Sequence, residues 1–474
     1  MIHSMKMIPA ASYDEIFMAA GRLCALEEKG YKEEEYFLDG TANVYERTAD
    51  GKKAVRFADA PYTSRFLLRY PKDPAAFSGN IVIEIDNATP GFDLDRSWIL
   101  TYKQIIRNGD VYVGLLSKPN VLTTLKMFDP ERYAPLAWKN PLTYESSAEE
   151  TDTILRNDPA SETGLFWDIL MDSARLMKKD DALNPLRDYI VRSAVPVKVF
   201  LMGWSQSGGY MLRFMKDFAL QEGSDCFDGY FSMGSAGSAA PALNQEDPRD
   251  LSEDLHPYGT DRPFIDMHTE SDNVKIGSVN TRLPDSEWYR IYDIAGPSHD
   301  TYYSEEEYYA EDTALRRLGR EMAYSCIDEH PNSFPSQFAY QAGLYYLEQW
   351  ARTGEAPFTV PSIPYDDALE NVKDADGNSL GGWRLPEITL PVCAYYGNST
   401  AGRSPEDNFS PMVYGREEPF PADELKKRYG SLAEYQKLVV NETDRCIEAG
   451  LLLKEDREDA IERAVKKAAK YGLE

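Results

Sequence analysis

Apolar positions follow two different periods along the first part of the chain. Short β-rich apolar runs predict strands, and stretches whose apolar residues recur every three or four positions predict helices. A short helical piece is expected before the first strand, and the clearest later helices are 93–106 and 165–178. Strands that alternate with helices in this way predict an α/β fold with a mostly parallel sheet and helices on both faces. The predicted strands are 35–44, 62–70, 79–85, 111–116, 197–202, 227–233, 263–268 and 288–294.

The pattern changes after the last of these strands and becomes mainly helical. Residues 337–353 place apolar side chains on one face of an amphipathic helix, and 422–474 contain further helices of this kind. Between them, residues 356–391 are rich in proline and glycine. We therefore expect one domain over residues 1–474, with a mainly helical C-terminal extension over 303–474.

A long insertion over residues 117–162 interrupts the alternation of strands and helices. It is rich in proline, aromatic and charged residues and has no clear strand. Insertions of this length in an α/β domain often form a lid or binding loop, although a surface excursion is the alternative. We expect it to wall the substrate pocket through four aromatic side chains: Phe128, Tyr133, Trp138 and Tyr144.

The stretch from Val195 to Leu212 combines a buried strand, a turn of small residues and a helix. The turn reads Gly203-Trp204-Ser205-Gln206-Ser207-Gly208-Gly209. This context is typical of a nucleophile elbow, in which a strained turn exposes a serine hydroxyl and the next backbone N–H can bind an oxyanion. The alternative is a turn of small residues without chemistry.

The pattern departs from G-x-S-x-G because Ser207 replaces the second glycine. Serine is small and Gly208 follows it, so we expect the close approach of helix and strand to be kept. Ser207 could instead be the nucleophile. We favour Ser205, because it follows the end of the strand by two residues.

A serine nucleophile needs a base, and the base needs an orienting acid. Of the five histidines, His299 lies in a glycine-containing loop directly after the last predicted strand, where the base of such a fold belongs. His268 lies inside a buried strand, and we interpret it as a core residue. His299 is therefore the predicted base.

Three acidic residues surround the end of the strand 263–268. Asp266 lies within the strand and is the least suitable. Asp272 and Glu270 both follow it, and Asp272 comes 27 residues before His299. We favour Asp272 as the acid and keep Glu270 as the alternative.

The oxyanion of an acyl-transfer reaction needs two backbone donors. The first is the N–H of Gln206, directly after the nucleophile. The second comes from the loop after strand 79–85, and we assign it to Ala88. Asn87 and Trp204, the neighbours of Ala88 and Ser205, are expected to line the substrate pocket.

The amino-acid composition limits the expected binding partners and the expected cellular compartment. With 51 Lys and Arg against 79 Asp and Glu, the net charge is −28, which disfavours nucleic acid and anionic membranes as partners. The five cysteines are scattered, so neither a disulfide framework nor a zinc site is indicated. No metal or organic cofactor is expected. The N-terminal residues lack the apolar run of a signal peptide, and no apolar stretch reaches the about 20 residues of a membrane span. These features predict a cytoplasmic protein.

Several segments together resemble one known family, the α/β-hydrolase-domain family called the Abhydrolase 10 group. They read GYKEEEYFLDGTANVY, GNIVIEIDNATPGFDL, MFDPERYAPL, GWSQSGGYMLRFM with CFDGYF, TESDNV, YDIAGPSH and DADGNSLGGWRLPEITLPVCAYYG. The resemblance covers about Gly30 to Gly397, and the helical tail is similar too. The family also has Ser-Gln-Ser-Gly at the turn, but an arginine is common where this chain has Gly209.

The resemblance implies an α/β-hydrolase fold and a serine hydrolase, with a carboxylic ester as the expected substrate. On this reading a small-molecule ester is attacked by Ser205, with His299 as base and Asp272 as acid. An amidase or peptidase, or an acyltransferase, would use the same triad. The non-enzymatic alternative is a protein with a hydrolase-like fold that binds a ligand without catalysis.

Overall fold

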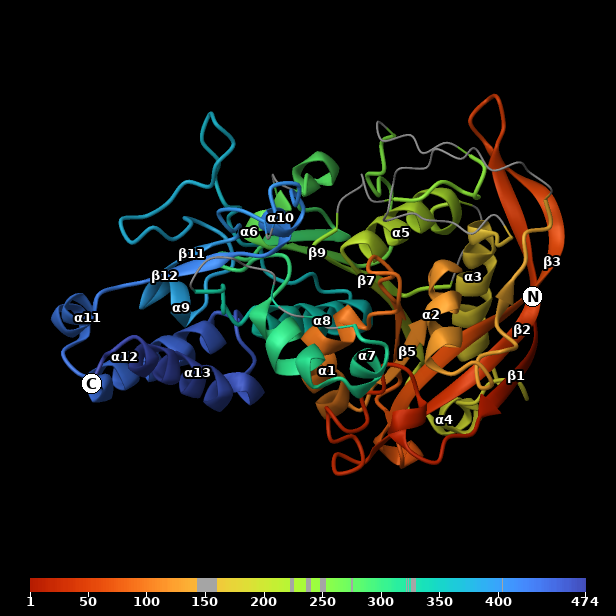
Figure 1. The fold of residues 1–474 in the computed structure, drawn as a ribbon, viewed down its shortest axis with the longest axis horizontal. Coiled ribbons are helices and arrows are strands. Elements are labelled where there is room, and N and C mark those ends of the chain that lie inside the picture. Colours follow the sequence, from red (N-terminus) through yellow and green to blue (C-terminus); the bar gives the residue numbers. More distant parts are fainter. Residues whose placement is uncertain are drawn as a thin grey trace. The chain divides into compact units, whose positions relative to one another are not determined.

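The computed structural model describes residues 1–142, 160–221, 226–235, 240–247, 253–273, 276–320, 322, 324, 330–402 and 404–474 (Figure 1). The chain divides into two compact units. The first comprises Met1–Pro263 and Glu311–Glu321, and the second comprises Phe264–Ala310 and Met322–Glu474.

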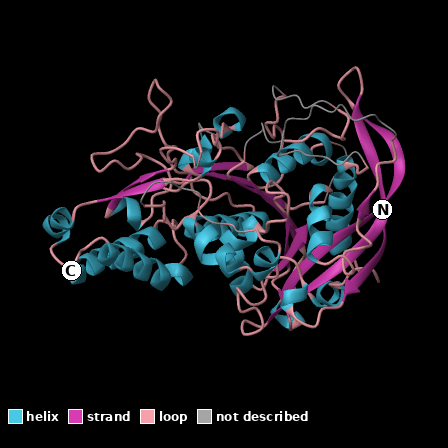
Figure 2. Cartoon of the chain, viewed as in Figure 1, coloured by secondary structure: helices cyan, strands magenta, loops and turns pink. Residues whose placement is uncertain are grey.

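The first unit begins with an antiparallel part of its sheet (Figure 2). β2 (Tyr31–Arg47) and β3 (Lys53–Pro71) form a long hairpin, and β1 (Ile2–Ile8) pairs with β2. The sequence did not predict β1, and the only helical element that the structure describes between β1 and β2 is the short 3-10 helix Tyr13–Glu15. Residues 2–8 are a strand because their backbone pairs with β2, a partner distant in sequence that local periodicity does not reveal.

The rest of this sheet is parallel, as predicted. Across the sheet of the first unit, the strands follow the order β1-β2-β3-β5-β4-β7-β8. β3 pairs antiparallel with β5, and the strands β5, β4, β7 and β8 are parallel to one another. Every residue of the central strand β4 is buried, in agreement with its apolar run. The elements of this part are β4 (Asn80–Ile85), α1 (Arg96–Asn108), β5 (Val111–Leu115), α3 (Phe166–Met177), α4 (Arg187–Arg192), β7 (Lys198–Trp204), α5 (Gln206–Phe214) and β8 (Gly229–Met233).

The described part of the insertion 117–162 contains α2 (Asn120–Phe128) and the short strand β6 (Ala137–Trp138), which pairs with β3. Phe128, Tyr133 and Trp138 are buried: the centres of the Phe128 and Phe17 rings lie 5.3 Å apart, and the Tyr133 hydroxyl donates to Glu35. Tyr144 lies outside the described residues. These aromatic side chains therefore pack inside the protein. That they also wall the substrate pocket stays a prediction.

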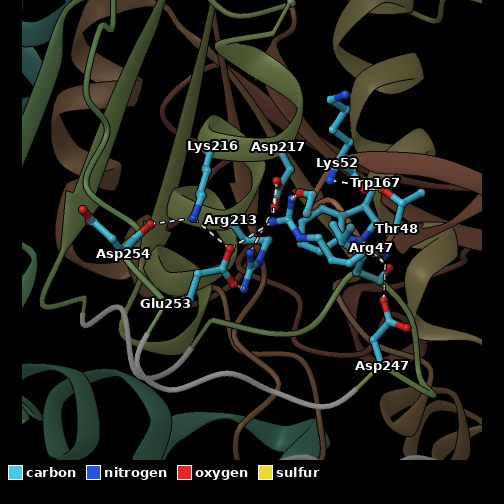
Figure 3. A network of polar contacts seen from close by, with 12 residues as sticks. Arg47, Thr48, Lys52, Trp167, Arg213, Lys216, Asp217, Asp247, Glu253 and Asp254 are labelled. Carbon is cyan, nitrogen blue, oxygen red and sulfur yellow. Dashed lines mark hydrogen bonds and ion pairs between the residues drawn. The ribbon is translucent and has the colours of Figure 1, made fainter.

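A partly buried ion network contacts the helix that follows the serine turn (Figure 3). Arg213 on α5 contacts Asp217 at 3.1 Å and Glu253 at 2.6 Å, and Arg47 from β2 contacts the same two carboxylates. Burial alone would raise the pKa of Glu253, but hydrogen bonds from Arg213 and Lys216 lower it to about 2. The network therefore fixes α5 to β2 and to the segment around Glu253.

The second unit contains the last two strands predicted from the sequence. β9 (Phe264–His268) and β10 (Tyr289–Asp293) pair in parallel, and the short helix α6 (Glu270–Asn273) follows β9 directly. His268 is fully buried in β9, as expected for a core residue. Asp266 lies 3.1 Å from its imidazole.

The C-terminal part is mainly helical, as predicted, but it also contains a two-stranded antiparallel ribbon. β11 (Cys393–Tyr396) and β12 (Arg416–Pro419) form this ribbon, so β10 is not the last strand. The sequence conceals β12 because it is short, charged and ends in proline. The helices are α7 (Thr313–Arg317, in the first unit), α8 (Gln337–Thr353), α9 (Pro386–Thr389), α10 (Ser410–Val413), α11 (Ala422–Tyr429), α12 (Leu432–Glu448) and α13 (Arg457–Lys470).

The amphipathic helices at the C-terminus share one apolar core. α11, α12 and α13 bury Leu425, Val439 and Ile461 against one another and against Val392. Each helix therefore buries the stripe of apolar residues that its period predicts. Within the described part of the chain, no helix has the length and apolar character needed to cross a membrane.

Candidate active site

Ser205 occupies a strained position between the end of β7 and the start of α5. Its φ of 57° and ψ of −121° lie in a region that side chains other than glycine rarely adopt. The Ser205 N–H donates to Met233 O at 2.8 Å, so the pairing of β7 with β8 continues into the turn. Ser207, the alternative nucleophile, lies inside α5 and is not among the residues with positive φ. The strain expected of a nucleophile elbow is therefore found at Ser205.

Two glycines allow the helix to approach the sheet at this turn. A Cβ on Gly203 would lie 2.6 Å from Ser207 O, and a Cβ on Gly208 would lie 2.2 Å from Ser235 Cβ. Both separations are far below van der Waals contact. The close approach of helix and strand that we expected is thus kept at Gly203, and Gly208 allows α5 to lie against Ser235, two residues after β8.

The loop after β4 is tied directly to the serine turn. Asn87 Nδ2 donates to Trp204 O at 3.1 Å, while its Oδ1 accepts from the Thr89 N–H at 3.0 Å. Two backbone hydrogen bonds between Asn87 and Leu94 close the loop. The Ala88 and Gln206 backbone N–H groups donate no hydrogen bond to any other described residue. Both predicted oxyanion donors are therefore available to an acceptor.

Asn87 and Trp204 have contacts of their own. Both are buried, the Asn87 amide is used in holding the loop, and the Arg96 guanidinium lies 4.6 Å from the centre of the Trp204 ring. These contacts describe structural support for the turn. That either residue also lines a substrate pocket stays a prediction.

Buried carboxyl groups flank the same loop. Burial raises the pKa of Asp93 to about 7 in spite of the nearby Arg65 guanidinium, and it raises that of Asp95 to about 6 in spite of Arg69. Burial and then repulsion by Asp93 hold the pKa of Asp86 well above its ordinary value. The pKa values of these groups are raised because the folded chain removes their charged forms from water.

Lys118 contacts the residue after the serine. It follows β5, it is buried, and its Nζ donates to Gln206 Oε1. Thr89 Oγ1 lies 3.4 Å from the same amide oxygen. Sequence reasoning missed Lys118, because a lysine next to a proline after a strand has the pattern of an exposed loop.

The second unit brings together two of the predicted site residues. His299 Nδ1 and Asp272 Oδ1 lie 2.5 Å apart, and both side chains are buried. Burial would raise the pKa of Asp272, but the charge of His299 and their hydrogen bond help to hold it below its ordinary value. Nδ1 therefore faces the carboxylate, and Nε2 is the ring nitrogen on the side of the imidazole away from it.

Backbone contacts fix both members of this pair. The Thr269 N–H donates to Asp272 Oδ2 at 2.6 Å, and the His299 N–H donates to Ser271 Oγ at 2.7 Å. The short turn after β9 thus holds the carboxylate and the histidine loop at once. Ser271 is a contributor that the sequence did not reveal, because serine is common in any turn.

Glu270, the alternative acid, has different partners. Its Oε1 accepts from the Gly296 N–H at 2.7 Å, and its Oε2 lies 3.0 Å from Lys373 Nζ. It borders a cavity of about 590 Å³ that Asn398 and Arg416 also line. The geometry therefore pairs His299 with Asp272 and gives Glu270 an ion pair with Lys373.

The predicted residues are divided between the two units. Ser205, Gln206, Ala88, Asn87 and Trp204 belong to the first, and Asp272, His299 and Glu270 belong to the second. Across the described ranges, no group of three or more His, Cys, Asp or Glu side chains is arranged to hold a metal ion.

Solved structures that resemble the chain share little sequence with it. A serine hydrolase without a lid from Xanthomonas campestris is 12% identical with a TM-score of 0.28, over 59% of this chain and 94% of that one. A dienelactone hydrolase from Anabaena variabilis is 14% identical with a TM-score of 0.26, over 59% and 93%. The rice cell wall degrading esterase LipA from Xanthomonas oryzae is 13% identical with a TM-score of 0.24, and the match spans 50% of each chain. No curated protein matches the chain.

A family model covers nearly the whole chain. The model of the α/β-hydrolase domain matches residues 5–462, which include the serine turn and the Asp272–His299 pair. This match confirms the resemblance that the sequence motifs indicated, and the order of strands and helices agrees with it. The chain therefore belongs to the α/β-hydrolase domain family.

Proposed function

We propose that this hydrolase cleaves carboxylic esters of small molecules through Ser205, His299 and Asp272. The observation that carries the proposal is the strained backbone of Ser205 at the turn between β7 and α5. Such strain is held only where the surrounding structure determines it, and it concentrates at functional positions. The hydrogen-bonded pair of His299 and Asp272 supplies the base and the acid that the proposal needs.

In the proposed reaction, Ser205 Oγ attacks the ester carbonyl carbon while His299 Nε2 takes the hydroxyl proton. The tetrahedral intermediate collapses, the alcohol leaves with that proton, and Ser205 carries the acyl group. A water molecule then attacks the acyl-enzyme, again with His299 as base. Asp272 holds the imidazole tautomer and stabilises its protonated form.

The negative oxygen of the intermediate is assigned to two backbone donors, the N–H groups of Gln206 and Ala88. Their lack of acceptors among the described residues supports this assignment. A donor that is already oriented before reaction stabilises the developing charge without reorganisation. Subtilisin loses about 10²–10³-fold in turnover when one such donor is removed.

The proposal also includes the domain organisation, the partners and the cellular location of the protein. Both units together form the catalytic domain, the substrate is a small molecule, and neither nucleic acid nor a membrane is a partner. The strongly negative charge supports this choice of partner. Four buried cysteines without disulfides (Cys24, Cys226, Cys393 and Cys446) support a cytoplasmic location.

The test is a panel of p-nitrophenyl esters of increasing acyl length, with the matching p-nitroanilides and an alcohol acceptor as competitors. We expect ester hydrolysis by the wild type and none above background by Ser205→Ala. Faster cleavage of anilides would favour an amidase, and transfer to the alcohol would favour an acyltransferase. Binding of the esters without turnover, with no change in Ser205→Ala, would favour the silent binding protein.

A further inference from the structure

The side-chain amide of Gln206 has an orientation that its neighbours determine. Lys118 Nζ donates to Oε1, and Thr89 Oγ1 lies 3.4 Å from the same atom. An ammonium group carries donors and no acceptor, so only the amide oxygen can face Lys118. The amide nitrogen, Nε2, therefore points away from Lys118. It donates to no other described residue and is not among the buried atoms that lack a partner.

Gln206 thus carries two available donors, its backbone N–H and its Nε2 group, directly after Ser205. The support for the second donor comes from two different loops. Thr89 belongs to the loop after β4, and Lys118 belongs to the turn after β5. The Lys118 ammonium also lies 5.5 Å from the centre of the Tyr210 ring on α5.

A buried lysine is expensive to keep, since removing an ammonium group from water costs free energy unless polar contacts compensate for it. In contact with an amide oxygen, its positive charge draws electron density from the amide. A polarised amide is a stronger hydrogen-bond donor at its nitrogen. Lys118 thus both fixes the direction of Nε2 and strengthens it.

We propose that the Gln206 side-chain amide is a third donor to the oxyanion at Ser205, and that Lys118 and Thr89 are positioning residues for it. The inference rests on the proposed function and deepens it. Gln206 Nε2–H donates to the carbonyl oxygen as that oxygen gains negative charge, and no covalent bond to the amide forms or breaks. The contact strengthens in the transition state, so it acts on kcat.

The decisive variants change Gln206 itself, with p-nitrophenyl acetate as substrate. Gln206→Met removes the donor at similar length, and we expect kcat to fall about 10-fold with KM changed less than about two-fold. Gln206→Glu keeps an oxygen for Lys118 and Thr89 but replaces the donor by a second carboxylate oxygen. We expect a larger fall in kcat, about 100-fold, because that oxygen repels the oxyanion.

Lys118 is tested through rescue. Lys118→Met should lower kcat about as much as Gln206→Met, and Lys118→Arg should recover part of the loss because its guanidinium can donate to Oε1. The matched control is Lys53→Met. Lys53 lies 3.9 Å from the centre of the Phe218 ring in the same unit, and we expect its variant to keep the wild-type kcat.

Labelling by a fluorophosphonate at Ser205 separates the possible failures. A labelled wild type with an unchanged kcat in Gln206→Met would overturn the inference and leave the proposed function standing. A fall in kcat/KM that comes from KM alone would also overturn it, because it would show ground-state binding. A wild type that is neither labelled nor active would overturn the proposed function and the inference together. If Lys118→Met does not fold, the Gln206 variants still decide.

Discussion

The serine turn and the acid–histidine pair reach their geometry in different ways. Ser205 is positioned by its backbone: a positive φ, and two glycines that let α5 approach the sheet. Asp272 and His299 are positioned by hydrogen bonds between buried side chains and backbone groups. The first region therefore depends on small size, and the second depends on hydrogen-bonding chemistry.

The two regions also respond to pH in opposite directions. The carboxyl groups beside the serine turn have raised pKa values, so the folded state binds more protons than the unfolded state. Asp272 has a lowered pKa, so the folded state binds fewer. Rising pH therefore weakens the first region, and falling pH weakens the second.

The largest expected effect separates the two serines of the turn. Ser205→Ala should lower turnover by about 10⁴–10⁶-fold, because the nucleophile is lost while the fold remains. Ser207→Ala should keep turnover within about three-fold of the wild type, since Ser207 lies within the helix. Steady-state hydrolysis of p-nitrophenyl acetate measures both. Loss of activity in Ser207→Ala alone would show that the strained residue is not the nucleophile.

The next effect tests the acid. Asp272→Asn should lower turnover about 10⁴-fold, the loss seen for the corresponding change in a serine protease triad, because the histidine loses its correct tautomer. Glu270→Gln should do far less, since Glu270 contacts Gly296 and Lys373 and not the imidazole. Both variants need kcat at saturating ester. The reverse ranking would assign the acid to Glu270.

A third variant tests whether the ion network around Arg213 stabilises α5, the helix after the serine turn. Arg213→Met removes one of the two arginines that contact both Asp217 and Glu253, while Arg47 remains, so the free energy of unfolding should fall by about 1–3 kcal/mol. Urea titration measures it. The control is Arg187→Met, which removes an exposed ion pair with Asp180 and should change nothing measurable. Equal stability of the two variants would contradict a supporting role for the network.

A methyl group on the serine turn tests the importance of size. Gly203→Ala places a Cβ against Ser207 O, so α5 must shift. We expect about 1–3 kcal/mol of destabilisation and a loss of turnover, because the shift moves Ser205. Ser271→Ala in the other region removes an acceptor without adding bulk, and it should leave labelling of Ser205 possible. Wild-type stability in Gly203→Ala would contradict the close approach.

The last prediction concerns the dependence of stability on pH. Between about pH 4 and 7, Asp93 should make stability fall with rising pH by at most about 1.4 kcal/mol per pH unit, and Asp93→Asn should remove that slope. The stability that Asp272 contributes is present above about pH 4 and lost as the pH falls further through its lowered pKa. Unfolding free energies at several pH values, compared with Asp93→Asn and Asp272→Asn, measure both. Slopes of the same sign would contradict the comparison.

The sequence predicted the backbone-determined region well and the rest less completely. Gly203, Ser205 and Gly208 lie close together in the chain, so their spacing alone predicts the turn. The choice of Asp272 over Glu270 depended on a bend whose hydrogen bonds only the structure shows. Lys118 is far from Gln206 in sequence, and β1 and β12 depend on pairing partners that local patterns do not reveal.

The proposed reaction depends above all on Ser205 as the nucleophile. Its most direct test is labelling of the wild-type protein with a fluorophosphonate, followed by mass spectrometry of its peptides. We expect one adduct on Ser205, no adduct in Ser205→Ala, and slower labelling in Asp272→Asn. An adduct on Ser207, or labelling that persists in Ser205→Ala, would contradict it.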